Sequence, residues 1–294
     1  YERHYSHIVE KSAELLRRVA ERCGREAVFA ISGSAGMGMA ESVKAPFVQE
    51  VFATRVAANR LAPGTDVIIE LGGEDAKILF LTNGLEVRMN GSCAGGTGAF
   101  IDQMATLLKM GAEEMDQAAQ MAEKTYTIAS RCGVFAKSDI QPLINDGATK
   151  EDLSASIFQA VVNQTISGLA CGKPIRGHVA FLGGPLHFLS ELKTAFVRTL
   201  KLDDEHTIVP DNSHLFAAIG SALNAKEDVT VSLTELKDRL RHSIKMDFEV
   251  ERMDPLFATE EDYEEFNKRQ SSYKVATGDL ASYKGNCYLG IDAG

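Results

Sequence analysis

Two glycines between acidic residues form the first segment that could do chemistry. Residues 70–77 read ELGGEDAK and follow an apolar run that is typical of a buried strand. Glycines let backbone N–H groups approach a phosphate closely, and neighbouring carboxylates can hold Mg²⁺ or orient a water molecule. A β-turn with solvated acids has the same spacing, so both interpretations stay open. The candidate residues are Gly72 and Gly73 for the phosphate, with Glu70, Glu74 and Asp75 as candidate catalytic acids.

A second pair of glycines, Gly183 and Gly184, lies between an apolar strand pattern and a helix pattern. Glycines at such a corner make room for a ligand, and the N-terminus of the following helix favours an anion or the edge of a base. A simple tight turn is the alternative for this pair taken alone. Two strand–Gly–Gly corners, one in each half of the chain, favour a nucleotide held between two lobes.

Two cysteines stand in glycine turns. Cys93 lies in residues 90–98, NGSCAGGTG, which open a predicted helix, and Cys132 lies in a Cys-Gly turn. A helix N-terminus lowers the pKa of a thiol and prepares it as a thiolate ligand. Two cysteines are half of a four-thiolate iron–sulfur site, which two copies of the chain related by a two-fold axis could complete. Two buried structural cysteines are the alternative.

The other cysteines, Cys23, Cys171 and Cys287, fall in helix or strand patterns, and we predict them to be structural. The seven histidines form no HxH or HxxxH pair, so the sequence does not indicate a zinc site. Five cysteines in 294 residues are too few for a disulfide framework, which indicates a reducing cytoplasm.

The composition limits the class of partner. The chain has 31 basic and 41 acidic side chains, a formal net charge of −10, and no run of lysine or arginine. An acidic chain of this kind is a poor candidate for binding a nucleic acid or an anionic membrane. We therefore expect neither as a partner.

The elements that must position these residues are strands and helices. Segments 66–71, 76–81 and 85–89 predict a three-stranded antiparallel meander with Gly-Gly at one corner and Asn-Gly at the other. A buried strand is predicted over 178–182 and a helix over 99–110. Further predictions are helices through 8–19, 47–61, 151–171 and 186–200, a helical region to about 126, strands over 27–32 and 128–135, and a strand plus helix within 207–225.

Beyond residue 225 the pattern changes. Apolar periodicity weakens, and residues 251–269 are dense in charge, so we predict a charged helical linker over 226–286. Residues 287–294, CYLGIDAG, have the pattern of a strand that runs into a phosphate-binding turn. Together with a start directly in a helix and without Met, this predicts a piece of a longer polypeptide.

Residues 70–75 and 90–101 together resemble the ATPase activators of 2-hydroxyacyl-CoA dehydratases and the related benzoyl-CoA reductase subunits. Residues 130–139, SRCGVFAKSD, resemble the second cysteine segment of that family, and residues 181–185, FLGGP, resemble its adenosine corner. The resemblance covers roughly residues 25–225.

The resemblance implies an α/β fold of the two-lobed actin/hexokinase/heat-shock-chaperone type around ATP, in a homodimer bridged by one [4Fe–4S] cluster. ATP binding and hydrolysis, with Mg²⁺, would change the angle between the lobes. One electron, supplied by a donor such as ferredoxin or flavodoxin, would pass to an acyl-CoA dehydratase-like partner. By this comparison Cys93 and Cys132 would hold the cluster, and the cofactor-binding candidates are Gly72, Gly73, Gly96, Gly98, Gly183 and Gly184.

The chain departs from the family pattern in two places. Glu70 and Glu74 stand where the family has Asp and Gln, and the first phosphate loop would precede Tyr1. Residues 288–294 resemble the start of such a loop, as in large proteins with two ATPase domains in tandem. We therefore expect an ATPase domain over 1–225 whose N-terminal lobe lacks its first strand, the linker, and the first strand of a second domain over 287–294. That strand could fill the empty position in the sheet.

Three functions remain open at this point. The leading one is an ATP-dependent activator that transfers an electron. The second is a regulatory or scaffold module that keeps the fold and the dimer but does not hydrolyse ATP. The third is a small-molecule kinase of the same superfamily, for which Cys93 and Cys132 would have no use.

Overall fold

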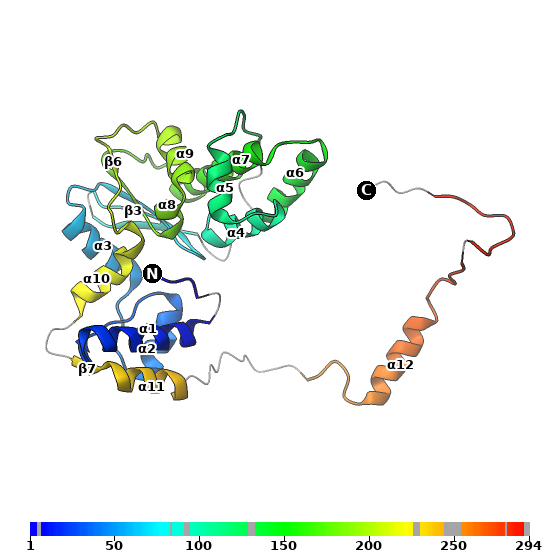
Figure 1. Cartoon of the computed structure of the whole chain (residues 1–294), viewed down its shortest axis with the longest axis horizontal. Coiled ribbons are helices and arrows are strands. Elements are labelled where there is room, and N and C mark those ends of the chain that lie inside the picture. The colour runs from blue at the N-terminus through cyan, green and yellow to red at the C-terminus, as the bar shows by residue number, and fades with distance from the viewer. Residues whose placement is uncertain are drawn as a thin grey trace. The chain divides into compact units, whose positions relative to one another are not determined.

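The computed structural model of the chain describes residues 1–4, 7–82, 84–90, 95–128, 133–225, 230–243, 254–279 and 281–290. The chain divides into two units, Tyr1–Lys245 and Met246–Gly294, which we describe separately (Figure 1). The first unit contains both glycine corners, so it is the unit that positions the candidate site.

A five-stranded mixed sheet forms the centre of the first unit. Its order is β4-β3-β2-β5-β6. The predicted meander is confirmed, because β3 pairs antiparallel with both β2 and β4, while β5 runs parallel to β2 and β6 parallel to β5. The strand bounds are β2 Val67–Leu71, β3 Ala76–Phe80, β4 Glu86–Met89, β5 Val179–Leu182 and β6 Thr207–Ile208. Because β2 and β5 are parallel neighbours, the two glycine corners that follow them lie at the same edge of the sheet.

Alternate residues of β2 face two different cores. Val67, Ile69 and Leu71 pack on one face, against helices that follow the meander in the chain. Ile68 packs on the other face with Ala57 of α3 (Glu50–Leu61) and Phe216 of α10 (Phe216–Asn224). The helices of the first face are α4 (Gly98–Leu107), α5 (Ala112–Ala119), α6 (Gly133–Asn145), α7 (Lys150–Asn163), α8 (Gly184–Phe188) and α9 (Ser190–Leu200). The apolar run of β2 is therefore explained by burial on both faces.

Helices α3 and α10 pack with their backbones in close approach. A Cβ placed at Gly220 of α10 would lie 1.7 Å from the carbonyl oxygen of Ala53 in α3, and Ala53 and Ala57 are fully buried. Only glycine fits at this crossing. The two helices therefore form a tight pair beneath the sheet (Figure 1).

A smaller part of the first unit combines residues from both ends of it. Strand β1 (Glu26–Val28) pairs antiparallel with β7 (Thr230–Ser232). Helices α1 (Ile8–Cys23), α2 (Ser34–Val43) and α11 (Leu233–Ser243) share a core that includes Leu16, Val43, Leu236 and Leu240. The structure thus places residues 230–243, which we predicted as linker, in a folded part of the unit. The reason is the i, i+3, i+7 spacing of Leu233, Leu236 and Leu240, which buries one helix face.

Several predicted elements differ from those observed. Residues 133–135, predicted as part of a strand, begin α6, because Ala136 and Ile140 recur at helical spacing and are buried. The helical region predicted to about 126 ends with α5 at Ala119. The strand predicted over 27–32 is the three-residue β1 followed by an isolated bridge from Ile31 to Phe47.

Two predicted helices are each interrupted. Residues 151–171 form α7 and then a π-helix, η1 (Gln164–Ala170). Residues 186–200 belong to α8 and α9, which are separate helices because Leu189 has extended backbone. A 3₁₀ turn, η2 (Ser213–Leu215), precedes α10.

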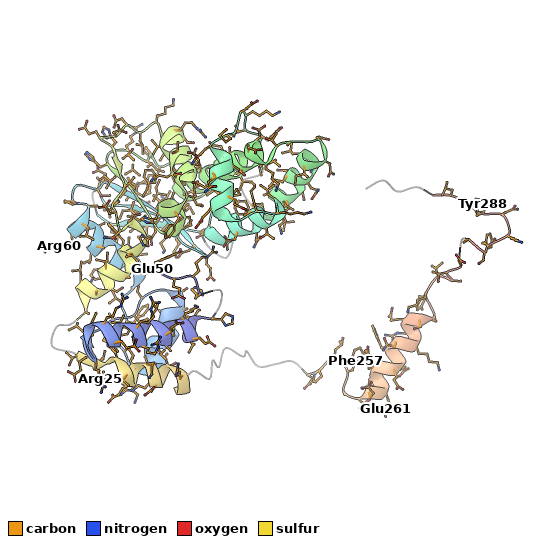
Figure 2. All side chains as sticks on the ribbon, viewed as in Figure 1. Arg25, Glu50, Arg60, Phe257, Glu261 and Tyr288 are labelled. Carbon is orange, nitrogen blue, oxygen red and sulfur yellow. The ribbon has the colours of Figure 1, made fainter. Side chains whose placement is uncertain are left out.

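The second unit contains one helix, α12 (Glu260–Ser271), among its described residues. Thr259 and Asp262 form a capping box at its start, and Phe257 packs against the rings of Tyr263 and Phe266. Residues 287–290, the described part of the predicted C-terminal strand, form no strand, and Tyr288 is fully exposed (Figure 2). Residues 291–294 lie outside the described residues, and the insertion of this segment into the sheet stays a prediction.

Candidate functional site

The two glycine corners touch each other. Gly183 has a φ of +92°, and a Cβ placed there would lie 2.0 Å from the carbonyl oxygen of Leu71, the last residue of β2. The N–H of Gly183 donates to the carbonyl oxygen of Ser213 at 3.0 Å. The corner therefore requires glycine for two reasons, its left-handed backbone and its contact with the neighbouring strand.

Helix α4 completes the meeting of the glycine segments. The N–H of Gly98 donates to the carbonyl oxygen of Gly72 at 2.9 Å, and the N–H of Ala99 donates to that of Gly73 at 2.7 Å. A Cβ at Gly98 would lie 3.2 Å from Gly72 and 3.4 Å from Pro185. The first turn of α4 therefore packs against one side of the Gly72–Gly73 turn. On the other side, a Cβ at Gly73 would meet nothing within 4 Å. The accessible side of this corner is the side of Gly73.

A buried lysine organises the acids of the first corner. Lys77 of β3 is 1% exposed and stands opposite Glu70 of β2 in the register of the sheet. Its Nζ lies 2.7 Å from Glu50 Oε1 and 2.9 Å from Asp75 Oδ2, and 3.9 Å from Glu70 Oε1. One ammonium group therefore faces three carboxylates that come from α3, β2 and the turn.

Burial and charge act on this cluster in opposite ways. Burial raises the pKa of Glu70 to about 7, and repulsion from Glu50 and Asp75 adds to the effect, against the attraction of Lys77 and a hydrogen bond from Thr54. The Thr54 hydroxyl donates to Glu70 Oε2 at 3.2 Å. Burial alone would lower the pKa of Lys77, but Glu70, Glu50 and Asp75 together raise it above its usual range. Lys77 therefore stays charged, and Glu70 is poised to change its protonation state near neutral pH.

Aromatic and imidazole rings surround the second corner. The rings of His187 and His214 have centroids 3.9 Å apart, and Phe188 lies 4.7 Å from His187 and 5.3 Å from His214. Tyr1 lies 5.2 Å from Phe188, and its hydroxyl would meet a Cβ at Gly184 at 2.7 Å. Burial and the nearby His187 lower the pKa of His214, which disfavours its charged form. Flat ring systems are suited to a planar ligand.

The structure brings most of the described site residues together. Glu70, Gly72, Gly73, Asp75, Gly98, Gly183 and Gly184 meet at one edge of the sheet, with Glu74 exposed at the turn. Gly96, two residues before Gly98, faces η1 instead, because a Cβ there would meet Gln164 and Thr165, each at 3.4 Å.

The predicted cluster ligands, Cys93 and Cys132, lie outside the described residues. Their described neighbours are close to one helix. Gly98 begins α4, and a Cβ at Gly133 would lie 3.5 Å from Phe100 of α4. The described cysteines, Cys23, Cys171 and Cys287, are exposed and free.

Sequence reasoning missed Glu50, Thr54 and Lys77, together with the rings of the second corner. A signal for Lys77 existed, because a meander with its corner at Gly72–Gly73 puts Lys77 opposite Glu70. Glu50 and Thr54 are spaced i, i+4, which puts both on one face of the predicted helix over 47–61. Nothing in the local sequence links that face to a strand that begins at Val67.

The oxygen ligands at the first corner suit a hard cation. No three His, Cys, Asp or Glu side chains of the described residues are arranged to hold a metal ion by themselves. Mg²⁺ usually takes only one or two carboxylates, and waters and substrate phosphates supply the rest. Asp75 and Glu74, at the accessible turn, fit that role.

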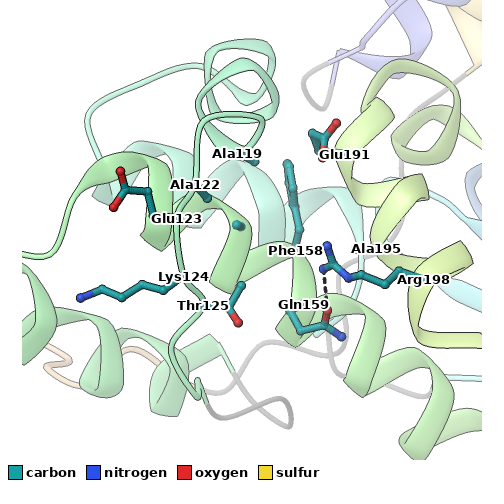
Figure 3. Close-up of a pocket in the computed structure, with 11 residues that line it drawn as sticks. Ala119, Ala122, Glu123, Lys124, Thr125, Phe158, Gln159, Glu191, Ala195 and Arg198 are labelled. Atoms are coloured by element: carbon teal, nitrogen blue, oxygen red, sulfur yellow. Dashed lines mark hydrogen bonds between the residues drawn. The ribbon is translucent and has the colours of Figure 1, made fainter.

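A separate depression of about 410 Å³ lies between α5, α7 and α9 (Figure 3). Phe158 lines its floor, and Arg198 donates to Gln159 Oε1 at 3.1 Å on its wall. None of the residues of the two glycine corners lines it. It is therefore distinct from the candidate site.

The search for long apolar helices gave a negative result for the described residues. None of their helices is long and apolar enough to cross a lipid bilayer.

Comparison with known proteins identifies the family. The model of the BadF/BadG/BcrA/BcrD ATPase family matches residues 7–225, which include both glycine corners and both segments around Cys93 and Cys132. The chain belongs to this family. The resemblance drawn from the motifs is thereby confirmed, and the candidate site lies within the part that the family shares.

Several curated relatives are named as activators. The chain is 33% identical over 183 residues to the 2-hydroxyisocaproyl-CoA dehydratase activator of Clostridioides difficile, an alignment of 61% of this chain and 67% of the relative. It is 30% identical over 158 residues to the (R)-2-hydroxyglutaryl-CoA dehydratase activating ATPase of Acidaminococcus fermentans, over 53% and 60% of the two chains. The chain thus spans about two thirds or less of the length of these relatives.

Solved activator structures share the fold. Component A of the Acidaminococcus fermentans (R)-2-hydroxyglutaryl-CoA dehydratase has a TM-score of 0.60 and 27% identity, over 67% of this chain and 74% of that chain. The Clostridium difficile 2-hydroxyisocaproyl-CoA dehydratase activator with bound ADPNP has a TM-score of 0.60 and 28% identity, over 77% and 78%. The predicted α/β fold of the actin/hexokinase/heat-shock-chaperone type is confirmed for this ATPase family member.

Proposed function

We propose that the chain is the nucleotide-binding part of an ATP-dependent activator of a 2-hydroxyacyl-CoA dehydratase-like enzyme. The observation that carries this proposal is the meeting of two glycine corners, one lined by charges and one by rings, in a member of an ATPase family. The charged corner suits phosphates, and the ring-lined corner suits a base. ATP hydrolysis would drive the transfer of one electron to the partner.

The first corner would bind the phosphates and their cation. Gly73 leaves open space above the turn, so backbone can approach a phosphate oxygen closely. Asp75 and Glu74 would hold Mg²⁺, which offsets the charge of the phosphates when it is bound. Glu70, buried behind the turn, is the acid that would orient a water molecule through its neighbours.

The second corner would bind the adenosine. Phe188, His187 and His214 offer ring faces next to Gly184, and the hydroxyl of Tyr1 lies beside the same glycine. Such stacking is tolerant of the base, so selectivity would come from polar groups at the ring edges. His214 Nδ1, buried and without a hydrogen-bond partner among the described residues, is one such group.

The electron-transfer part of the proposal rests on Cys93 and Cys132. These residues would hold one [4Fe–4S] cluster between two copies of the chain, and the cluster supplies a single electron when it is bound. The names of the relatives support the activator role, and the contact of Gly133 with Phe100 puts the residue after Cys132 next to α4, the helix that follows the Cys93 segment. A cytoplasmic ferredoxin or flavodoxin would be the donor, and an acyl-CoA dehydratase-like enzyme the acceptor.

One preparation tests both parts. The chain is purified without oxygen, and its iron content and its affinity for ATP with Mg²⁺ are measured. We expect ATP binding and about two iron atoms per chain, half of a shared four-iron cluster. Cys93→Ala should remove the iron and leave ATP binding in place, while the exposed Cys23→Ala should change neither. A protein without iron that binds no ATP would refute the proposal.

A regulatory module that binds ATP without hydrolysing it is the second candidate. The observation in its favour is that Glu70 is 7% exposed and held by Lys77 and Thr54, away from the accessible side of the turn. In that case the chain would bind ATP but release no phosphate. A measurement of phosphate release, in parallel with a titration of ATP binding, distinguishes the two functions.

A further inference from the structure

Two helices connect the sheet of the first unit to its smaller helical part. Helix α3 follows the bridge between Ile31 and Phe47, and α10 precedes β7, which pairs with β1. The backbones of the two helices are in contact where they cross, at Gly220 and Ala53. A displacement of α3 would therefore move α10 as well.

Lys77 is bonded to both α3 and the turn of the first corner. Its ammonium group lies 2.7 Å from Glu50, at the start of α3, and 2.9 Å from Asp75, in the turn. Glu50 and Arg60 mark the two ends of this helix (Figure 2). A second contact joins α3 to β2, because Thr54, one helical turn after Glu50, donates a hydrogen bond to Glu70. Side chains of α3 thus reach the acids beside Gly72 and Gly73.

The cluster has more negative than positive charge. One ammonium group faces three carboxylates, and Lys77 is almost fully buried, so water screens these interactions little. A cation that arrives with a nucleotide at Asp75 would compete with Lys77 for that carboxylate. The ammonium group of Lys77 would then pair more closely with Glu50 and Glu70, and α3 would be displaced.

We propose that Lys77 is a positioning residue, which couples occupancy of the Gly72–Gly73 turn to the α3–α10 pair through its ion pairs with Asp75 and Glu50. The inference rests on the proposed nucleotide function and adds a residue through which binding is transmitted. A ligand shifts a conformation only through interactions that differ between the two states. The exchange of partners at Lys77 is such an interaction.

Hydrogen exchange of the full chain, with and without ATP and Mg²⁺, tests the coupling. In the unmodified protein we expect nucleotide to slow exchange in the turn at 72–75 and also in α3 and α10. Glu50→Gln removes the ion pair to α3 and leaves the contact of Lys77 with Asp75 in place. In this variant we expect slowing in the turn and none in the two helices. Equal slowing of the helices in Glu50→Gln and the unmodified protein would overturn the inference.

Matched variants separate coupling from a general loss of structure. Glu21→Gln breaks the exposed pair of Glu21 with Arg17 on α1 and should keep the full response. Lys77→Arg keeps the positive charge and should preserve the nucleotide-dependent slowing of exchange in α3 and α10, whereas Lys77→Met should abolish it. An affinity change on the order of tenfold between these two variants is expected for coupled sites.

The proposed function and the inference fail in different ways. No slowing in the turn of the unmodified protein would refute nucleotide binding. The bond to α3 is then still measurable without nucleotide, because Glu50→Gln should speed exchange in α3 several-fold relative to Glu21→Gln. Equal exchange of these two variants would refute the bond as well.

Discussion

The two glycine corners share a backbone design and differ in everything around it. Each follows a fully buried strand, and the two strands are parallel neighbours. The first corner is surrounded by Lys77 and three carboxylates, and the second by Phe188, His187 and His214. The same local sequence therefore occurs twice, but the chemistry of each corner comes from other segments.

The corners also differ in how tightly they are packed. A Cβ at Gly183 would overlap the backbone of Leu71, whereas a Cβ at Gly73 would stand in open space. One glycine is required by the fold, and the other leaves space that a ligand could use. Comparisons of stability and of ligand binding at the two positions can separate these roles.

The largest effect is expected for Gly183→Ala. The new Cβ would meet the Leu71 carbonyl at 2.0 Å in a backbone with φ of +92°, so the strands must separate. The free energy of unfolding should fall by about 5 kcal/mol or more. Gly73→Ala should change it by less than about 1 kcal/mol and weaken ATP binding instead. Urea denaturation and ATP titration measure both, and equal destabilisation by the two substitutions would contradict the comparison.

Lys77→Met should have the next largest effect. It leaves Glu50, Glu70 and Asp75 close together without their common cation. Removal of one partner of a buried ion pair lowers the free energy of unfolding by about 3–4 kcal/mol. Arg17→Met removes an exposed partner of Glu21 and should change stability by less than about 1 kcal/mol. A loss for Lys77→Met no greater than that of this control would show that the cluster is open to water.

The first corner should also give the protein a pH dependence. Burial raises the pKa of Glu70 from 4.5 to about 7. The folded state therefore keeps a proton that the unfolded chain releases, and stability falls as the pH rises from about 4.5 to about 7. The fall due to this group should be on the order of 3 kcal/mol. Glu70→Gln should remove it, which urea denaturation at several pH values would measure. An unchanged difference between variant and unmodified protein across that range would be evidence against a buried Glu70.

The smallest effects are expected at the rings and the hydroxyl group beside the second corner. Ser213→Ala removes the 2.8 Å hydrogen bond between its hydroxyl and His187 Nδ1 and should destabilise the protein by about 1 kcal/mol. His214→Phe removes a buried nitrogen that has no partner among the described residues, so stability should be unchanged or slightly higher. Thermal denaturation measures both. A large loss for His214→Phe would reveal a polar role for that nitrogen in the fold.

The sequence correctly predicted the strands and the turn that carry the first corner. The run from Val67 to Phe80 gave the meander, because a strand buried on both faces reads as a continuous apolar run and Gly72–Gly73 can only be a corner. The prediction of a strand was wrong at Gly133, because the short apolar pattern there fits a strand or a helix equally well. Packing against α4 stabilises the helix that is observed. Over 230–243 the predicted helical linker contains a helix, α11, but the sequence did not show that this helix packs against α1 and α2.

The sequence by itself determined the family, the two glycine corners and the acids beside the first. These features are local, because a turn and its neighbouring side chains are set within a few residues. Only the tertiary structure decided that the corners touch, that Lys77 is shared by three carboxylates, and that Glu50 belongs to the site. The physical reason is that strand pairing and the packing of α3 bring together residues that are far apart in the chain, and charge and burial depend on those distances.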